Sequence, residues 1–266
     1  MKNNNNQQIR NSYLLDTSVQ IERCKNPEVS NFLYKKTSDG STLVCSFFVL
    51  YEFKTGLLKS IIDFYFLVKI FDSASRALSE WSNKFQIRQV KNALIMQSIL
   101  FRINSSISCG DTNDYLRKLR AVIFNLEEEF YTYVSSMVGD FQNDEIVKLS
   151  IKNEEEYKEF ITAYNKRKCI PLDVFWNKYD KELSILLNCD NFRNEKKMVS
   201  MYKYLQEINV DLRNAKKVRN NKGIGDAIIS VDCGNKRTVL SFDNSFSILC
   251  PPLKKKFEII NRASIV

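Results

Sequence analysis

The stretch of sequence that most constrains the fold runs from residue 221 to 249 and reads NKGIGDAIISVDCGNKRTVLSFDNSFSIL. Asp226 follows two glycines and opens an apolar run, so we expect it in the first turn of a helix, where the helix dipole stabilises a carboxylate. The apolar segment 238–242 has the composition of a buried strand, and Asp243 follows it. Open α/β sheets bind ligands at the carboxyl ends of their strands. One acid that opens a helix and another that ends the next strand therefore predict a metal site.

Two further acids occupy similar places earlier in the chain. The apolar segment 12–15 predicts a strand that ends at Asp16, with a helix after it. The segment 42–48 predicts a second strand, and Glu52 lies in the first turns of the helix predicted at 49–58. Taken singly, Asp16 is more simply explained as a helix cap, and Glu52 as a solvent-exposed helix residue. In a parallel sheet all four acids converge on one edge, so we interpret them as one site.

The amino-acid composition limits the chemistry of this site. The chain contains no histidine, which excludes serine–histidine and cysteine–histidine catalysis and every histidine-ligated metal. Clustered carboxylates raise one another's pKa, and a divalent cation offsets their repulsion. Carboxylate oxygens favour Mg²⁺ or Mn²⁺ as the cofactor. We expect a metal-activated water as the nucleophile, assisted by one carboxylate, with Ser18 or Ser241 donating a hydrogen bond to a ligand carboxylate.

The charge of the chain indicates an anionic partner. The formal net charge is +9, which favours nucleic acid first and an acidic membrane surface second. A group of basic residues closely precedes Asp226, and we interpret its members as candidate nucleic-acid-binding residues that attract phosphate. They are Lys216, Lys217, Arg219 and Lys222. A solvated helix face explains the same lysine-rich run about as well.

The composition also bears on the cellular setting. The seven cysteines are scattered, with no C-x-x-C pair, which argues against a disulfide framework or a zinc ribbon. No apolar run approaches the ~20 residues that span a bilayer, and the polar N-terminus lacks the apolar segment of a secretory signal. We therefore expect a cytoplasmic protein with no membrane segment, in which the cysteines act as small core residues.

Residues 57–214 have an almost entirely helical pattern. The apolar residues between Leu116 and Met137 recur at three- and four-residue steps and predict an amphipathic helix. Similar stripes occupy 87–101, 157–164 and 199–208. We interpret the aromatic residues of these stripes as helix core rather than as base-stacking platforms, because their spacing is that of a helix face.

These patterns divide the chain into three parts. Residues 1–10 are expected to form a disordered tail. Residues 11–60 and 215–266 are expected to form the catalytic core. Residues 61–214 are expected to form a helical insertion that packs on that core.

Four pieces of the sequence together resemble a known family. They are LLDTS at 14–18, SFFVLYEFKTG at 46–56, GDAII at 225–229 and LSFDNSF at 240–246. In this order they resemble the PIN-domain nucleases, over roughly residues 11–60 and 218–250. The resemblance implies a PIN-like three-layer α/β/α sandwich with a central parallel sheet, elaborated here by a mostly helical insertion. It also implies cleavage of phosphodiester bonds, usually in RNA, with Mg²⁺ or Mn²⁺.

The resemblance implies one shared catalytic and metal-binding role for Asp16, Glu52, Asp226 and Asp243. Two features depart from the family pattern. Toxin-type members often have a further acid at the position of Ser245, which leaves a second metal position open. The connection between the second and third acids is also far longer than in compact toxin-type members. We interpret it as an insertion that supplies substrate specificity, a partner surface or a lid.

We therefore expect a metal-dependent endonuclease, with RNA as the favoured substrate. Single-stranded DNA is the alternative substrate, because the sequence does not separate the two polymers. A second interpretation is a non-catalytic nucleic-acid-binding or scaffold protein that keeps the fold. A third is a toxin or defence effector that an inhibitory partner protein, supplied in trans, holds inactive.

Overall fold

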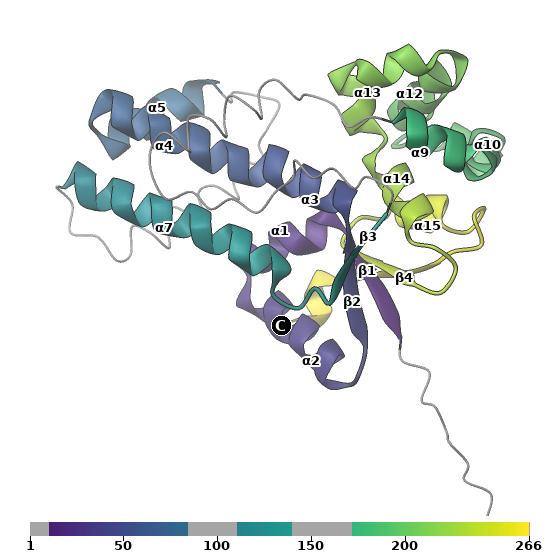
Figure 1. Cartoon of the computed structure of the whole chain (residues 1–266), viewed down its shortest axis with the longest axis horizontal. Coiled ribbons are helices and arrows are strands. Elements are labelled where there is room, and N and C mark those ends of the chain that lie inside the picture. Colours follow the sequence, from purple (N-terminus) through teal and green to yellow (C-terminus); the bar gives the residue numbers. More distant parts are fainter. Residues whose placement is uncertain (1–10, 85–110, 140–171, 266) are drawn as a thin grey trace, which may run out of the picture.

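The computed structural model describes residues 11–84, 111–139 and 172–265, which form an α/β fold around a five-stranded sheet (Figure 1). All neighbouring strands run parallel, in the order β3-β2-β1-β4-β5. The strands are β1 (Ser12–Leu15), β2 (Thr42–Ser46), β3 (Ser136–Val138), β4 (Thr238–Ser241) and β5 (Lys256–Ile259). The predicted α/β class with a central parallel sheet is confirmed, and the many helices are consistent with three α/β/α layers.

Helices connect the strands and extend beyond the sheet. The first are α1 (Thr17–Lys25), α2 (Pro27–Ser38) and α3 (Phe47–Phe53), then a π-helical turn η1 (Lys54–Leu58) and α4 (Lys59–Phe71). Next come α5 (Ala74–Lys84), α7 (Thr112–Tyr131), α9 (Asp173–Lys178), α10 (Asp180–Leu187), α11 (Asp190–Asn194) and α12 (Val199–Val210). The last are the 3₁₀ helix η2 (Leu212–Lys216), α13 (Val218–Gly223), α14 (Gly225–Asp232), α15 (Phe246–Leu249) and the 3₁₀ helix η3 (Arg262–Ser264).

The central strands β1 and β4 are apolar throughout their inner residues because both faces of a parallel sheet are covered. Leu14 pairs with Val239 and Leu15 with Leu240, and all four side chains are fully buried. The predicted strands at these two places are therefore confirmed.

Strand β2 ends earlier than the sequence predicted. The prediction extended it to residue 48, whereas it ends at Ser46. The Ser46 hydroxyl accepts a hydrogen bond from the backbone N–H of Val49 (3.2 Å) and so caps the start of α3. This cap begins the helix that carries Glu52.

Edge strand β3 comes from within the segment 61–214, which we predicted as a helical insertion. Its Met137 pairs with Cys45 of β2. The sequence pattern predicted a helix through Met137, and this is wrong, because α7 ends at Tyr131. Tyr133 then takes a left-handed backbone conformation (φ 67°) that helical geometry does not allow. The segment thus supplies a strand of the sheet as well as helices.

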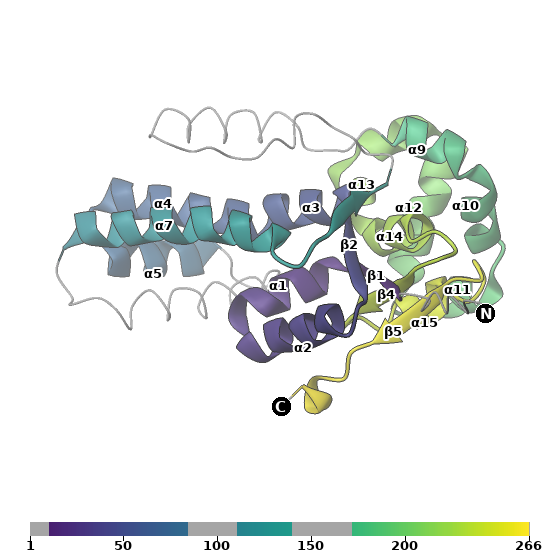
Figure 2. The same cartoon turned by 60° about the horizontal axis from the view of Figure 1, so that its bottom comes forward.

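Helices α4, α5 and α7 pack side by side as an arm that extends away from the sheet (Figure 1 and Figure 2). Helices α9 to α13 gather on the opposite side of the sheet from this arm (Figure 2). Helix α12 confirms the stripe predicted at 199–208, whereas the stripes at 87–101 and 157–164 and the tail 1–10 lie outside the described residues. In the part of the chain that the structure describes, no helix is long and apolar enough to cross a membrane.

Four of the five described cysteines occupy core positions, as predicted, whereas Cys189 is half-buried. Cys24, Cys45, Cys233 and Cys250 are buried free thiols. Burial raises the pKa of Cys45 and of Cys233 to about 12, so both stay protonated at neutral pH.

Candidate functional site

The four predicted acids lie at the carboxyl edge of the sheet, three on segments that leave it and Asp226 at the start of the helix that leads into β4. Asp16 follows β1 directly, and its backbone N–H donates to the carbonyl of Leu240 in β4 (3.0 Å). Asp243 follows β4, Glu52 lies on α3 after β2, and Asp226 lies in the first turn of α14. Neighbouring parallel strands end at one edge, so residues far apart in the sequence meet here.

Two serine hydroxyls hold Asp16. Ser18 Oγ (2.5 Å) and Ser241 Oγ (2.7 Å) both donate to Asp16 Oδ2, and the backbone N–H of Ser18 reaches the same oxygen (3.2 Å). Asp16 is only 3% exposed, and this burial raises its pKa, while the hydrogen bonds lower it. These are the two serines that the sequence indicated as donors to a ligand carboxylate.

Ser245 forms hydrogen bonds with both Asp226 and Asp243. Its hydroxyl donates to Asp226 Oδ2 (2.6 Å), and its backbone N–H donates to Asp243 Oδ1 (2.9 Å). The backbone N–H of Asp243 donates in turn to Ser241 Oγ (2.8 Å), which joins this pair to Asp16. A hydrogen-bond donor, rather than a further acid, therefore occupies this position between two carboxylates.

Glu52 reaches the site from α3 and packs against a glycine. The Thr17 hydroxyl donates to Glu52 Oε2 (2.5 Å). A Cβ atom at Gly225 would lie 2.6 Å from Glu52 Oε1 and 2.9 Å from the Phe48 ring. Only glycine leaves room for the carboxylate in this position.

Electrostatic repulsion between the carboxylates affects the pKa of Glu52. Burial raises the pKa of Glu52 to about 8, the charges of Asp226 and Asp16 act in the same direction, and Lys222 opposes them. The four side chains offer only oxygen atoms as metal ligands, and Mg²⁺ and Mn²⁺ prefer oxygen ligands. A bound cation would also reduce the repulsion between the carboxylates. As the side chains stand, no group of three or more acids or cysteines among the described residues is placed to hold a metal ion. The donor chemistry fits the ion, and binding it requires these side chains to draw together.

The basic residues predicted to bind phosphate lie in three different settings. Lys222 is near enough to the acids to lower the pKa of Glu52. Arg219 instead pairs with Glu207 of α12 (3.3 Å). Lys216 and Lys217 are exposed where η2 ends. The structure therefore brings Lys222 to the acids and directs Arg219 toward α12.

A groove of about 670 Å³ opens beside the acids, with Asp226 and Asp243 in its wall. Its other walls come from α1, from the start of α12, from α15 and from η3. The residues of α12 and η3 that line it carry no functional signal in the sequence. The candidate site is thus accessible from the surface along this groove.

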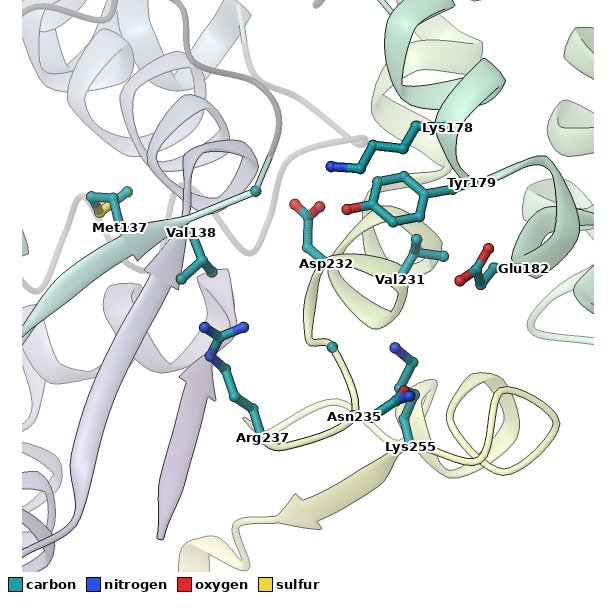
Figure 3. Close-up of a pocket in the computed structure, with 12 residues that line it drawn as sticks. Met137, Val138, Lys178, Tyr179, Glu182, Val231, Asp232, Asn235, Arg237 and Lys255 are labelled. Atoms are coloured by element: carbon teal, nitrogen blue, oxygen red, sulfur yellow. The ribbon is translucent and has the colours of Figure 1, made fainter. Parts of the chain in front are cut away.

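A second pocket of about 560 Å³ lies at the other end of α14 (Figure 3). Figure 3 shows the carboxylate of Asp232 pointing toward Lys178 and the Tyr179 hydroxyl. Arg237 and Lys255 enter the pocket from the segments that precede β4 and β5. This pocket therefore mixes acidic and basic groups, whereas the carboxyl edge of the sheet gathers acids.

Comparisons with known proteins give no match: the chain matches no protein-family model, no curated protein and no solved structure. What the site can do therefore follows from its own residues and their contacts.

The acids and two of the serines were predicted from the sequence, whereas the contacts of Thr17, Ser245 and Gly225 were not. Thr17 directly follows Asp16, and Ser245 lies two residues after Asp243. A hydroxyl residue so close to a predicted metal ligand is a signal from which both contacts could have been predicted. The contact of Gly225 with Glu52 depends on how α14 packs on α3, for which the sequence carries no local signal.

Proposed function

We propose that this chain is a metal-dependent endonuclease that hydrolyses phosphodiester bonds, with RNA as the favoured substrate and single-stranded DNA as the alternative. The observation that carries the proposal is the convergence of four acids from separate parts of the sequence on one edge of a parallel sheet. Their repulsion opposes folding, and a bound cation at a reaction centre would offset it. The PIN-like motifs of the sequence support the same activity.

The carboxylates proposed to hold Mg²⁺ or Mn²⁺ are Asp16, Glu52, Asp226 and Asp243. A bound ion supplies a water of lowered pKa and neutralises charge on the phosphate. Hydrogen-bond donors of the chain keep the carboxylates oriented: Ser245 donates its hydroxyl to Asp226 and its backbone N–H to Asp243. One carboxylate of the set accepts the proton of the attacking water, and Lys222 offers a positive charge to the phosphate.

The order of the four acids and the parallel sheet favour a PIN-like arrangement that the arm of α4, α5 and α7 extends. A cytoplasmic setting and an inhibitory partner supplied in trans belong to this proposal as predictions from the sequence. The competing function is a non-catalytic nucleic-acid-binding or scaffold protein, which would keep the fold without the chemistry.

A nuclease assay on labelled single-stranded RNA and DNA tests the proposal, with Mg²⁺, with Mn²⁺ and with EDTA. The matched variant is Asp16→Asn, because asparagine still caps α1 while the metal-binding carboxylate is lost. We expect the wild-type protein to cleave, EDTA to abolish this cleavage, and Asp16→Asn to show none. The circular dichroism spectra of the two proteins should be the same. Cleavage that persists in EDTA or in the variant would contradict the site. No cleavage of either polymer, with no heat of Mn²⁺ binding in calorimetry, would favour the scaffold.

A further inference from the structure

The groove beside Asp226 and Asp243 continues beyond the acids, over residues that the proposed hydrolysis does not use. Helix α1 and the start of α12 both line it, together with Phe242, which directly precedes Asp243. The volume of about 670 Å³ lies within the range of roughly 300–1,000 Å³ that is typical of ligand sites. The groove can therefore hold part of a substrate whose reacting phosphate lies at the acids.

Part of the lining of the groove is apolar. Phe242 immediately precedes Asp243, and Met198, Met201 and Ile248 line the groove with it. Phosphate and sugar gain little from such side chains, whereas the faces of an unpaired base stack on aromatic rings and contribute much of the affinity for single strands. Methionine adds a flexible, polarisable surface that adapts to a flat ligand. The lining therefore suits a base.

Positive charges border this apolar surface. The guanidinium of Arg262 lies 5.5 Å from the centre of the Phe242 ring and pairs with Glu22 of α1 (3.2 Å). The Arg262 side chain is 66% exposed, so it can turn toward a ligand without unfolding the chain. Glu22 also pairs with Lys25 (2.9 Å), which partly neutralises the cations of the groove. Affinity here should then come more from base contacts than from phosphate neutralisation.

We infer that this groove is a base-binding subsite of the proposed nuclease, and the inference rests on that function. An unpaired base of the substrate stacks on Phe242 and contacts Met198 and Met201, while Arg262 contacts its edge or the adjoining phosphate. Because Phe242 adjoins Asp243 in the chain, a nucleotide held there places its phosphate toward the acids. The two methionines belong to the segment between the second and third acids, so this segment takes part in substrate selection.

The test compares the binding of a short fluorescent single-stranded oligonucleotide with the binding of the same backbone made fully abasic. Anisotropy is measured with Mn²⁺ in the Asp226→Asn protein, in which the oligonucleotide stays intact under the proposed mechanism. We expect the abasic backbone to bind roughly tenfold more weakly. Adding Phe242→Leu should weaken binding of the intact oligonucleotide by a similar factor and leave binding of the abasic one almost unchanged. Arg262→Ala, at an exposed position, should weaken binding of the intact oligonucleotide without affecting the fold.

The matched control is Phe257→Leu, which alters a phenylalanine of β5 that is 37% exposed and lies outside the groove. It should leave both affinities unchanged. Equal binding of the two backbones, an equal loss on both with Phe242→Leu, or no binding of either by the folded protein would each overturn the subsite. The nuclease proposal is judged separately: metal-dependent cleavage without base-dependent binding would leave it standing and remove the subsite. Base-dependent binding at Phe242 without cleavage would keep the subsite in a protein that is not a nuclease.

Discussion

Helix α14 carries an aspartate near each end, and the two ends have opposite surroundings. Asp226, at the N-terminal end, adds its charge to a group of carboxylates and raises the pKa of Glu52. Asp232, at the C-terminal end, shares a pocket with Lys178, Arg237 and Lys255 (Figure 3). An acid among bases has positive charges nearby, whereas an acid among acids needs a cation from outside the chain. The comparison places the candidate reaction centre at the N-terminal end of the helix.

The largest effect should come from replacing each aspartate by asparagine. With Asp226→Asn we expect cleavage to fall by at least ~100-fold, because the variant loses a proposed metal ligand, and the fold to be retained. With Asp232→Asn we expect an unchanged cleavage rate per folded molecule and a loss of ~1–3 kcal/mol in the free energy of unfolding, because this carboxylate is only 5% exposed. Steady-state cleavage and urea unfolding measure both variants. The reverse pattern would move the reaction centre to the other end of α14.

A smaller effect should follow from adding one methyl group at the N-terminal end. The Cβ atom of Gly225→Ala would lie 2.6 Å from Glu52 Oε1, so the carboxylate must move out of its place. We expect a loss of activity of about 10- to 100-fold and weaker Mn²⁺ binding by calorimetry. Gly56→Ala, a helical glycine with open space around its Cβ position, is the control and should retain activity. Equal activity of the two variants would contradict the role of Gly225.

The corresponding change at the C-terminal end should affect stability alone. Gly139 has φ 99°, and a Cβ atom there would lie 2.7 Å from Asp232 Oδ2. Gly40 has φ 83° with nothing within 4 Å, so its alanine variant measures the backbone strain by itself, roughly 1–2 kcal/mol. We expect Gly139→Ala to cost about 1 kcal/mol more than Gly40→Ala in urea unfolding, because the Asp232 carboxylate must also shift. Equal costs would mean that this contact is unimportant.

The smallest effect should be a pH dependence of stability that comes from Glu52. Its pKa is 4.5 when unperturbed and about 8 in the folded protein, so between these values the folded state retains a proton that the unfolded chain has released. Rising pH therefore favours unfolding across this window. We expect the melting temperature of the metal-free protein to fall by a few degrees between about pH 5 and pH 8 relative to Glu52→Gln. Mn²⁺ should reverse the fall near pH 8, because it binds ionised carboxylates. A melting temperature that rises relative to Glu52→Gln would contradict the direction of this shift.

The centre of the fold was predictable because its signals are local. In β1 and β4 an apolar run buried on both faces stands directly before an acid, which identifies both the strand and its carboxyl end. Strand β3 was not predictable in this way. It has only three residues, and the helical spacing of α7 continues in the sequence through Met137 although the backbone turns at Tyr133. Pairing with β2, a tertiary interaction, decides its conformation.

The same distinction applies to the site. Ser18 lies two residues after Asp16, so its hydrogen bond to that acid could be anticipated from the sequence. Ser241 lies two residues before Asp243, and only the fold directs its hydroxyl to Asp16 instead. The groove could not be anticipated, because only the folded chain brings Arg262 of η3 and Met201 of α12 into one groove with Phe242. Of the basic residues predicted near the acids, the fold directs Arg219 to Glu207 instead.

The continuity of α3, η1 and α4 has a mechanical consequence. These segments join without a break, so residues 47–71 form one rod that at ~1.5 Å per residue extends over roughly 35 Å. Glu52 lies near the end beside the sheet, and the other end lies in the arm (Figure 1). A small tilt of such a lever at its outer end displaces the carboxylate at its inner end. We therefore expect a molecule that binds the arm to change the distance between Glu52 and the three aspartates.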